Sequence, residues 1–198
     1  MEMAQGEVTY TVDAEDFVIS FNAEWTRFAE DNESPDLADI GQLSDRSIIE
    51  FVESYSCKTL YTMLLARVRT TQETVSIPFR CDAPHERRFM KMVLSPLTDG
   101  SVVFKTTLLK AEARDFINLL SIDREKSEGM IVVCSWCNKV EVDHDNGQWR
   151  EVEEAIKILG LLNDAQQPPV THGCCSACYQ SISAKINFKK AYPQKSTE

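Results

Sequence analysis

The stretch VSIPFRCDAPHERRFMKMVLSPLTDGSVVFKTTLL at residues 75–109 contains two runs in which apolar and polar residues alternate, followed by a third strand-like run, VVFKTTLL (102–109). In the first run, apolar residues from Val75 to Phe79 occupy every second position, which is the period of a β-strand with one buried face. The turn sequences APHE (83–86) and PLTDGS (96–101) separate the three runs. Since short turns join neighbouring antiparallel strands, the stretch predicts a three-stranded antiparallel meander.

The residues before this meander predict two more strands and several helices. The alternating sequences VTYTVD (8–13) and FVISFN (17–22) are typical of two short strands joined by a tight turn. Apolar residues have helical spacing in AEWTRFAEDN (23–32), which Asn22 can cap, and in CKTLYTMLLARVRTT (57–71). Together with the meander, this order predicts an α+β fold: a five-stranded antiparallel sheet with helices on one face.

The order of elements and the sequence RCDAPHERRFMKM (80–92) together resemble the PAS sensor family. Residues 80–92 are similar to the RCD-x-P … RR stretch of a small PAS-like group of bacterial proteins. The resemblance covers about residues 7–115 and implies a PAS-like sensing or protein-interaction domain. Because one fold hosts many functions, it identifies neither the signal nor a small-molecule ligand.

Residues 109–127 are expected to form a helix that connects this domain to the C-terminal part of the chain. Four apolar residues in it follow one another at helical intervals and share one stripe: Leu109, Ala113, Phe116 and Leu120. This stripe must be buried, either within the chain or against the same stripe of a second chain. A homodimer is therefore one of two open expectations.

Five of the seven cysteines lie in CSWC (134–137) and THGCCSAC (171–178). Each sequence contains a Cys-x-x-Cys pair, whose two-residue spacer allows a tight turn to present two thiolates to one metal ion. Two such turns complete a closed four-sulfur site for zinc, and residues 130–190 are expected to form a small zinc-binding domain around it. The predicted ligands are Cys134, Cys137, Cys175 and Cys178.

Other uses of these thiols stay open. Cys174 competes with Cys175 as a ligand, His172 competes with either, and two dithiols could also form a redox pair. The sequences CSWCNK, GQWREVEEAI and THGCCSAC resemble a segment that follows PAS or receiver domains in bacterial two-component proteins. That pattern usually has an apolar residue where Cys174 stands. It implies that His172 lies beside the site, where it could hydrogen-bond a thiolate or orient the loop.

A charged group at the first turn of the meander is a second candidate site. Arg80 and Asp82 are expected on the same strand face, and Arg88 could reach them from the next strand. The three residues could form an ion-pair network. Alternatively they could form a patch that binds a carboxylate ligand or a protein partner, because guanidinium groups suit carboxylates.

The charge distribution and the N-terminus restrict the function classes. The net charge is −10, and residues 1–60 alone carry 14 acidic and three basic side chains, which argues against binding of a nucleic-acid backbone there. The N-terminal sequence MEMAQGEVTYTVDAED has no apolar core of a secretory signal, and no apolar run approaches the length of a membrane helix. We therefore expect a cytoplasmic protein that does not bind membranes.

The sequence lacks the motifs of common enzyme classes: it contains no P-loop, no Gly-rich dinucleotide turn and no GxSxG elbow. This absence favours a protein without catalytic activity, and the resemblance to PAS and two-component proteins implies a bacterial signalling protein that acts through a protein partner. One alternative is a zinc-dependent nucleic-acid-binding regulator, which the basic end KINFKKAYPQK (185–195) favours weakly. The other is a thiol redox sensor or oxidoreductase.

Overall fold

The computed structural model describes residues 6–186 except 32–34, 45, 122–126, 162–165 and 167. Its strands are β1 (Val8–Val12), β2 (Val18–Phe21), β3 (Val75–Arg80), β4 (Glu86–Pro96), β5 (Val102–Ala113), β6 (Ile131–Cys134), β7 (Val140–Asp143), β8 (Gln148–Arg150) and β9 (Val170–Gly173). Its α-helices are α1 (Ala23–Asp31), α2 (Ile40–Leu43), α3 (Tyr55–Thr71), α4 (Val152–Ile158) and α5 (Ser176–Ile186). Three short 3-10 helices complete it: η1 (Pro35–Ala38), η2 (Ile48–Phe51) and η3 (Asn118–Leu120).

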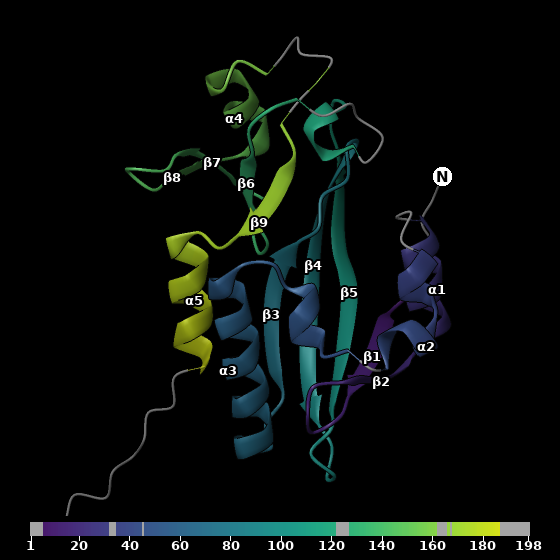
Figure 1. Cartoon of the computed structure of the whole chain (residues 1–198). Coiled ribbons are helices and arrows are strands. Elements are labelled where there is room, and N and C mark those ends of the chain that lie inside the picture. The colour runs from purple at the N-terminus through teal and green to yellow at the C-terminus, as the bar shows by residue number, and fades with distance from the viewer. Residues whose placement is uncertain are drawn as a thin grey trace, which may run out of the picture.

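Five strands form one antiparallel sheet in the order β2-β1-β5-β4-β3 (Figure 1). The predicted meander is confirmed, since β3 pairs with β4 and β4 pairs with β5, both antiparallel. Strand β1 lies on the other side of β5, with Val8 opposite Thr106 and Val12 opposite Val102. The predicted α+β class with a five-stranded antiparallel sheet is therefore confirmed.

Helix α3 covers one face of this sheet. Its side chains Leu60, Leu64 and Val68 are fully buried in one core with Leu94 of β4 and Phe104 of β5. Full burial of each such side chain stabilises the fold by about 1.5–3 kcal/mol relative to exposure. These contacts fix the position of α3 over β4 and β5.

Two side-chain caps set where the helices begin. Asn22 Oδ1 accepts the backbone N–H of Trp25 at 3.1 Å, so the predicted cap of α1 is confirmed. Ser54 Oγ accepts the backbone N–H of Cys57 at 3.1 Å and closes the first turn of α3. The start of α3 matters for the site described below, because Cys57 faces it.

The expected helix at 109–127 is wrong over its described part. Strand β5 continues to Ala113 and is followed by the short helix η3, while residues 122–126 lie outside the described residues. A β-bulge explains the misreading: Met90 pairs with Leu108 and Phe89 with Lys110, so Leu109 is an extra residue in β5. One inserted residue breaks the two-residue period of the strand. The apolar spacing beyond it then looks helical.

The C-terminal part forms a second, four-stranded sheet in the order β8-β7-β6-β9. Its neighbours β6 and β9 are parallel, while the other pairs are antiparallel. Helix α4 packs over this sheet, and Val152 and Ala155 on it are fully buried with Val140 of β7. Ile117 and Leu119, from the segment after β5, are buried in the same cluster.

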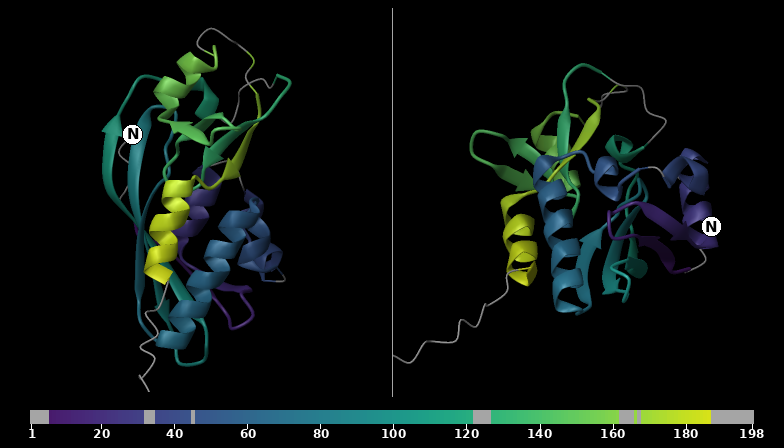
Figure 2. Two further views of the ribbon diagram at one scale, coloured as in Figure 1. Left: turned by 90° about the vertical axis from the view of Figure 1, so that its left-hand side faces the viewer. Right: turned by 60° about the horizontal axis from the view of Figure 1, so that its bottom comes forward.

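The two sheets share hydrophobic contacts. The core around α3 also contains Cys134, Trp136 and Cys175, together with Ile182 and Ile186 of α5. Helix α5 lies side by side with α3 in both Figure 1 and Figure 2. Side chains from α5 and from the segment before it thus complete a core that begins in the first sheet.

Candidate metal centre

The parallel pairing of β6 and β9 brings the two cysteine pairs together. In the register of these two strands, Cys134 lies opposite Gly173. The backbone N–H of Ser135 donates to the carbonyl of Gly173 at 2.9 Å. The first pair follows the end of β6, and the second follows the end of β9. Parallel strands end at the same edge of a sheet, so both pairs lie at that edge.

A tight turn after β6 positions the first pair. The backbone N–H of Asn138 donates to the carbonyl of Cys134 at 2.9 Å, and Cys134 N–H donates to the carbonyl of Lys139 at 2.8 Å. Asn138 has a φ of 55°, a left-handed conformation that asparagine tolerates better than most residues. The reversal turns the thiols of Cys134 and Cys137 towards the same space.

The second pair lies at the N-terminus of α5. The backbone N–H of Cys175 donates to Sγ of Cys134 at 3.4 Å, and that of Cys178 donates to Sγ of Cys175 at 3.4 Å. The positive end of the helix dipole favours negative charge at this position. Backbone N–H groups and the helix terminus therefore both stabilise thiolates here.

The four sulfur atoms form one compact cluster. Sγ atoms of Cys134, Cys137, Cys175 and Cys178 all lie within 4.8 Å of one another, and those of Cys137 and Cys175 are 3.8 Å apart. In a tetrahedral zinc site with Zn–S bonds of about 2.3 Å, the sulfur atoms are roughly 3.8 Å apart. The sulfur set is compatible with a metal ion of this kind, and Cys134 and Cys175 are buried.

Hydrogen bonds between the thiols separate their pKa values. Bonds from Cys137, Cys174 and Cys178 hold the pKa of Cys134 far below its usual range. The pKa of Cys137 is raised to about 12, because its thiol donates to Cys134. A metal ion binds thiolates and not thiols, so the protons that these cysteines carry must leave when a metal binds.

Two further cysteines flank the cluster. Cys174 hydrogen-bonds the sulfur atoms of Cys134 and Cys57, and Cys57 Sγ also lies 3.4 Å from the carbonyl oxygen of Gly173. The bond from Cys174 is the main cause that lowers the pKa of Cys57 to about 6. The sequence indicated no role for Cys57, because it lies on α3, far from the paired cysteines along the chain.

His172 lies beside the metal-binding segment, and its ring contacts Glu53. Its Nδ1 is 3.4 Å from Glu53 Oε2, and its backbone N–H donates to the same oxygen at 3.0 Å. Burial raises the pKa of Glu53, but these bonds and one from Thr171 outweigh it and lower the pKa. Of the two implied roles, the contacts with Glu53 fit orientation of the loop and not a bond to a thiolate.

The turn that carries the first cysteine pair is docked on α3 and β3. The ring of Trp136 stacks on Tyr61 of α3 with centroids 5.4 Å apart, and its side chain is buried. The backbone N–H of Arg80 donates to the carbonyl of Trp136 at 2.9 Å. Trp136, between Cys134 and Cys137, therefore joins the metal-binding turn to α3 and to the first sheet.

The charged group at 80–88 forms a buried ion-pair network instead of an open patch. The carboxylate of Asp82 is fully buried, pairs with Arg80 and lies 3.1 Å from Arg114 Nη1. Arg80 Nη1 also lies 2.6 Å from Glu151, and Arg114 Nη1 lies 3.3 Å from Glu153. Since Glu151 and Glu153 lie at the start of α4, the network connects the first sheet to the second.

The prediction for Arg88 needs correction. Its guanidinium donates to the carbonyl of Cys81, and only its backbone N–H reaches Asp82, at 3.3 Å. Burial lowers the pKa of Arg80, but hydrogen bonds to Asp82 and Glu151 outweigh it and hold the pKa above the usual range. The guanidinium of Arg80 is thus bound within the chain.

Gly173 is placed where a side chain does not fit. A Cβ atom on it would lie 2.8 Å from Cγ1 of Val132, and valine has few alternative rotamers. Gly173→Ala should therefore destabilise the protein by about 1–3 kcal/mol, measured by urea unfolding. The same change in a Val132→Ala background should cost markedly less, and equal costs in both backgrounds would contradict the steric reason.

Comparisons with known proteins do not assign a family. No protein-family model matches the chain, and no curated protein matches it at a significant level. Within the described residues, no helix has the length and apolar content needed to cross a membrane. Of the basic stretch at 185–195, only the first two residues are described, so its predicted role stays a prediction.

Proposed function

We propose that the chain is a non-catalytic bacterial signalling protein of the cytoplasm. A PAS-like sensing or interaction domain is coupled in it to a structural zinc site with four cysteine ligands. The resemblance to PAS domains rests partly on the order of two strands, helices and three strands, and this order forms the first sheet. Zinc is favoured as the metal because four clustered thiolates suit it.

One observation carries the coupling: the metal-binding turn is docked on α3, the helix that covers the sheet of the proposed sensing domain. Tyr61 of α3 stacks on Trp136, and Cys57 of α3 contacts Gly173, which precedes the second cysteine pair. A shift of α3 on the sheet would therefore displace both halves of the metal site. In this proposal, zinc holds the turn rigid so that such a shift reaches a protein partner.

We expect one zinc ion per chain in protein purified without added metal. Thiolate ligation supplies folding free energy to a small segment, which favours tight binding. Elemental analysis combined with native mass spectrometry measures the metal and any retained small molecule together. Stoichiometric iron, or a metal-free protein with disulfides among the four cysteines, would contradict the zinc proposal.

Removal of the metal should also weaken the first sheet. Hydrogen exchange of the backbone amides that pair β1 with β5 measures the stability of the first sheet and leaves Trp136 in place. With a chelator present, the protection of these amides should fall, because both parts share one core. Unchanged protection, with the metal shown to be gone, would show that the two parts are uncoupled.

A redox sensor is the second candidate, and the position of Cys57 and Cys174 favours it. Both thiols lie beside the cluster, and Cys174 hydrogen-bonds the sulfur of the ligand Cys134. Hydrogen peroxide could accept two electrons from Cys174 and Cys134, which would form a disulfide and two waters and remove one ligand. Zinc would then be released. Peroxide-induced zinc release, slowed by Cys174→Ser and reversed by a dithiol reductant, would support this function over a purely structural site.

A further inference from the structure

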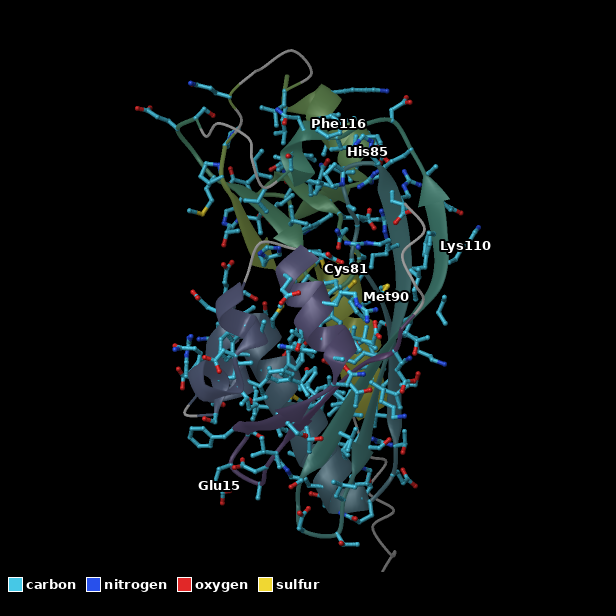
Figure 3. The ribbon with its side chains drawn as sticks, turned by 90° about the vertical axis from the view of Figure 1, so that its right-hand side faces the viewer. Glu15, Cys81, His85, Met90, Lys110 and Phe116 are labelled. Carbon is cyan, nitrogen blue, oxygen red and sulfur yellow. The ribbon has the colours of Figure 1, made fainter. Side chains whose placement is uncertain are left out.

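Strand β5 is paired along its whole length on one edge but only along part of its length on the other. Strand β4 pairs with β5 from Val102 to Ala113, whereas β1 pairs only with Val102–Thr106. Within the described part of the chain, no strand pairs with the other edge of Thr107–Ala113. Figure 3 shows this half of β5, marked by Lys110, at the margin of the molecule.

The described residues before β1, Gly6 and Glu7, do not pair with this edge. An antiparallel continuation of β1 would run alongside Thr107–Ala113, but Gly6 lies against α1 instead. A Cβ atom on Gly6 would collide with the side chain of Glu24 at 2.2 Å. Glu7 makes its ion pair with Lys105 at 2.9 Å, which is still within the paired part of β5. The described chain therefore leaves β5 just before this edge begins.

The backbone groups on this edge are oriented to pair with another strand. Arg114 donates its backbone N–H to the carbonyl of His85 at 2.9 Å, on the side of β4. The side to which a residue's backbone N–H and C=O groups point alternates from one residue to the next along a strand. Ala113 and Ala111 therefore direct these groups to the edge that β4 does not occupy. Such an edge is a template for strand addition. The alanines are exposed, and Leu109 is 57% exposed.

We propose that a second copy of this chain pairs with this edge, β5 against β5, antiparallel, around a two-fold axis at Ala111. Charge complementarity selects this occupant and this register. Lys110 then lies opposite Glu112 of the partner subunit, and Glu112 lies opposite Lys110 of the partner subunit. Within one chain, Lys110 Nζ lies 2.5 Å from Glu112 Oε1, and both side chains are exposed. Each side chain can therefore pair with the opposite charge of the second copy instead of with its own neighbour.

The pairing joins the two five-stranded sheets into one continuous sheet. The new interface comprises one short strand pair, which is smaller than most stable interfaces. We therefore expect a dimer with a Kd of roughly 10–100 µM, a range that light scattering covers. This dimer uses neither the metal site nor the helix that the sequence predicted at 109–127, so it does not depend on the proposed function.

A charge-exchange experiment tests the register. Lys110→Glu places like charges opposite each other across the axis, and so does Glu112→Lys, so each variant alone should be monomeric at about 200 µM. Mixed in equal amounts, the two should form a heterodimer, because every cross-strand pair is then complementary. The double variant carrying both changes should dimerise like the wild type. Both side chains are exposed, and circular dichroism and metal content provide the folding controls.

Hydrogen exchange provides an independent measurement. The amides of Ala111 and Ala113 should become protected as the protein concentration rises, and remain unprotected in Lys110→Glu. A wild type that is monomeric up to about 500 µM would overturn the proposal. A dimer that both single variants retain would also overturn it. Protection that does not depend on concentration would assign the edge to a segment of the same chain instead.

Discussion

Replacing any one of Cys134, Cys137, Cys175 or Cys178 with serine should release the metal and destabilise the whole protein. Loss of a structural metal belongs to the mutations that cost about 4 kcal/mol or more. For a chain of this size, that corresponds to a decrease in Tm of roughly 8–16 °C. Elemental analysis measures the metal, and thermal unfolding followed by circular dichroism measures the Tm.

Cys174→Ser is the matched control, because Cys174 adjoins Cys175 but lies outside the cluster of four sulfur atoms. This variant should keep its metal and lose little stability. If Cys174→Ser released the metal while Cys175→Ser retained it, the assignment of ligands would be wrong. Metal retained by all four single variants would show that no closed four-cysteine site forms.

Asp82→Asn should be the most destabilising substitution outside the metal site. It keeps the size of the side chain but removes the fully buried negative charge that lies between Arg80 and Arg114. Both guanidinium groups are largely buried, and removing one partner from a buried ion pair costs about 3–5 kcal/mol. The free energy of unfolding in urea at neutral pH measures this cost.

Glu154→Gln is the control for this experiment. Glu154 also lies on α4 and pairs with Arg150 at 3.3 Å, but its side chain is mostly exposed. Exposed ion pairs contribute about 1 kcal/mol or less, so this variant should unfold almost like the wild type. If Asp82→Asn lost no more stability than Glu154→Gln, the network would not be what joins the first sheet to α4.

Much of the first sheet could be predicted because its signals are local. Alternation from Val75 to Phe79 and the short turns after it determine which strands are neighbours, and both are visible in the sequence. The end of β5 could not be predicted in this way. The bulge at Leu109 depends on how β5 pairs with β4, and a residue added to one strand removes the period on which strand prediction relies.

The same distinction applies to the two candidate sites. The spacing within each Cys-x-x-Cys pair is a local property, so the four clustered cysteines were predictable. The contacts of Cys57 with Gly173 and of Tyr61 with Trp136 join distant segments and leave no pattern in the sequence. In the charged network, Arg114 was not predicted because it lies 39 residues from its partner Glu153.

The parallel pairing of β6 with β9 has a consequence during synthesis on the ribosome. Cys137 and Cys175 are 38 residues apart, so at typical elongation rates the second pair emerges about 2–8 s after the first. During this interval two thiols are exposed to oxidation, and the side of α3 that later contacts α5 remains uncovered. A nascent chain stalled between the two pairs should therefore bind chaperones more strongly than one released after Ile186.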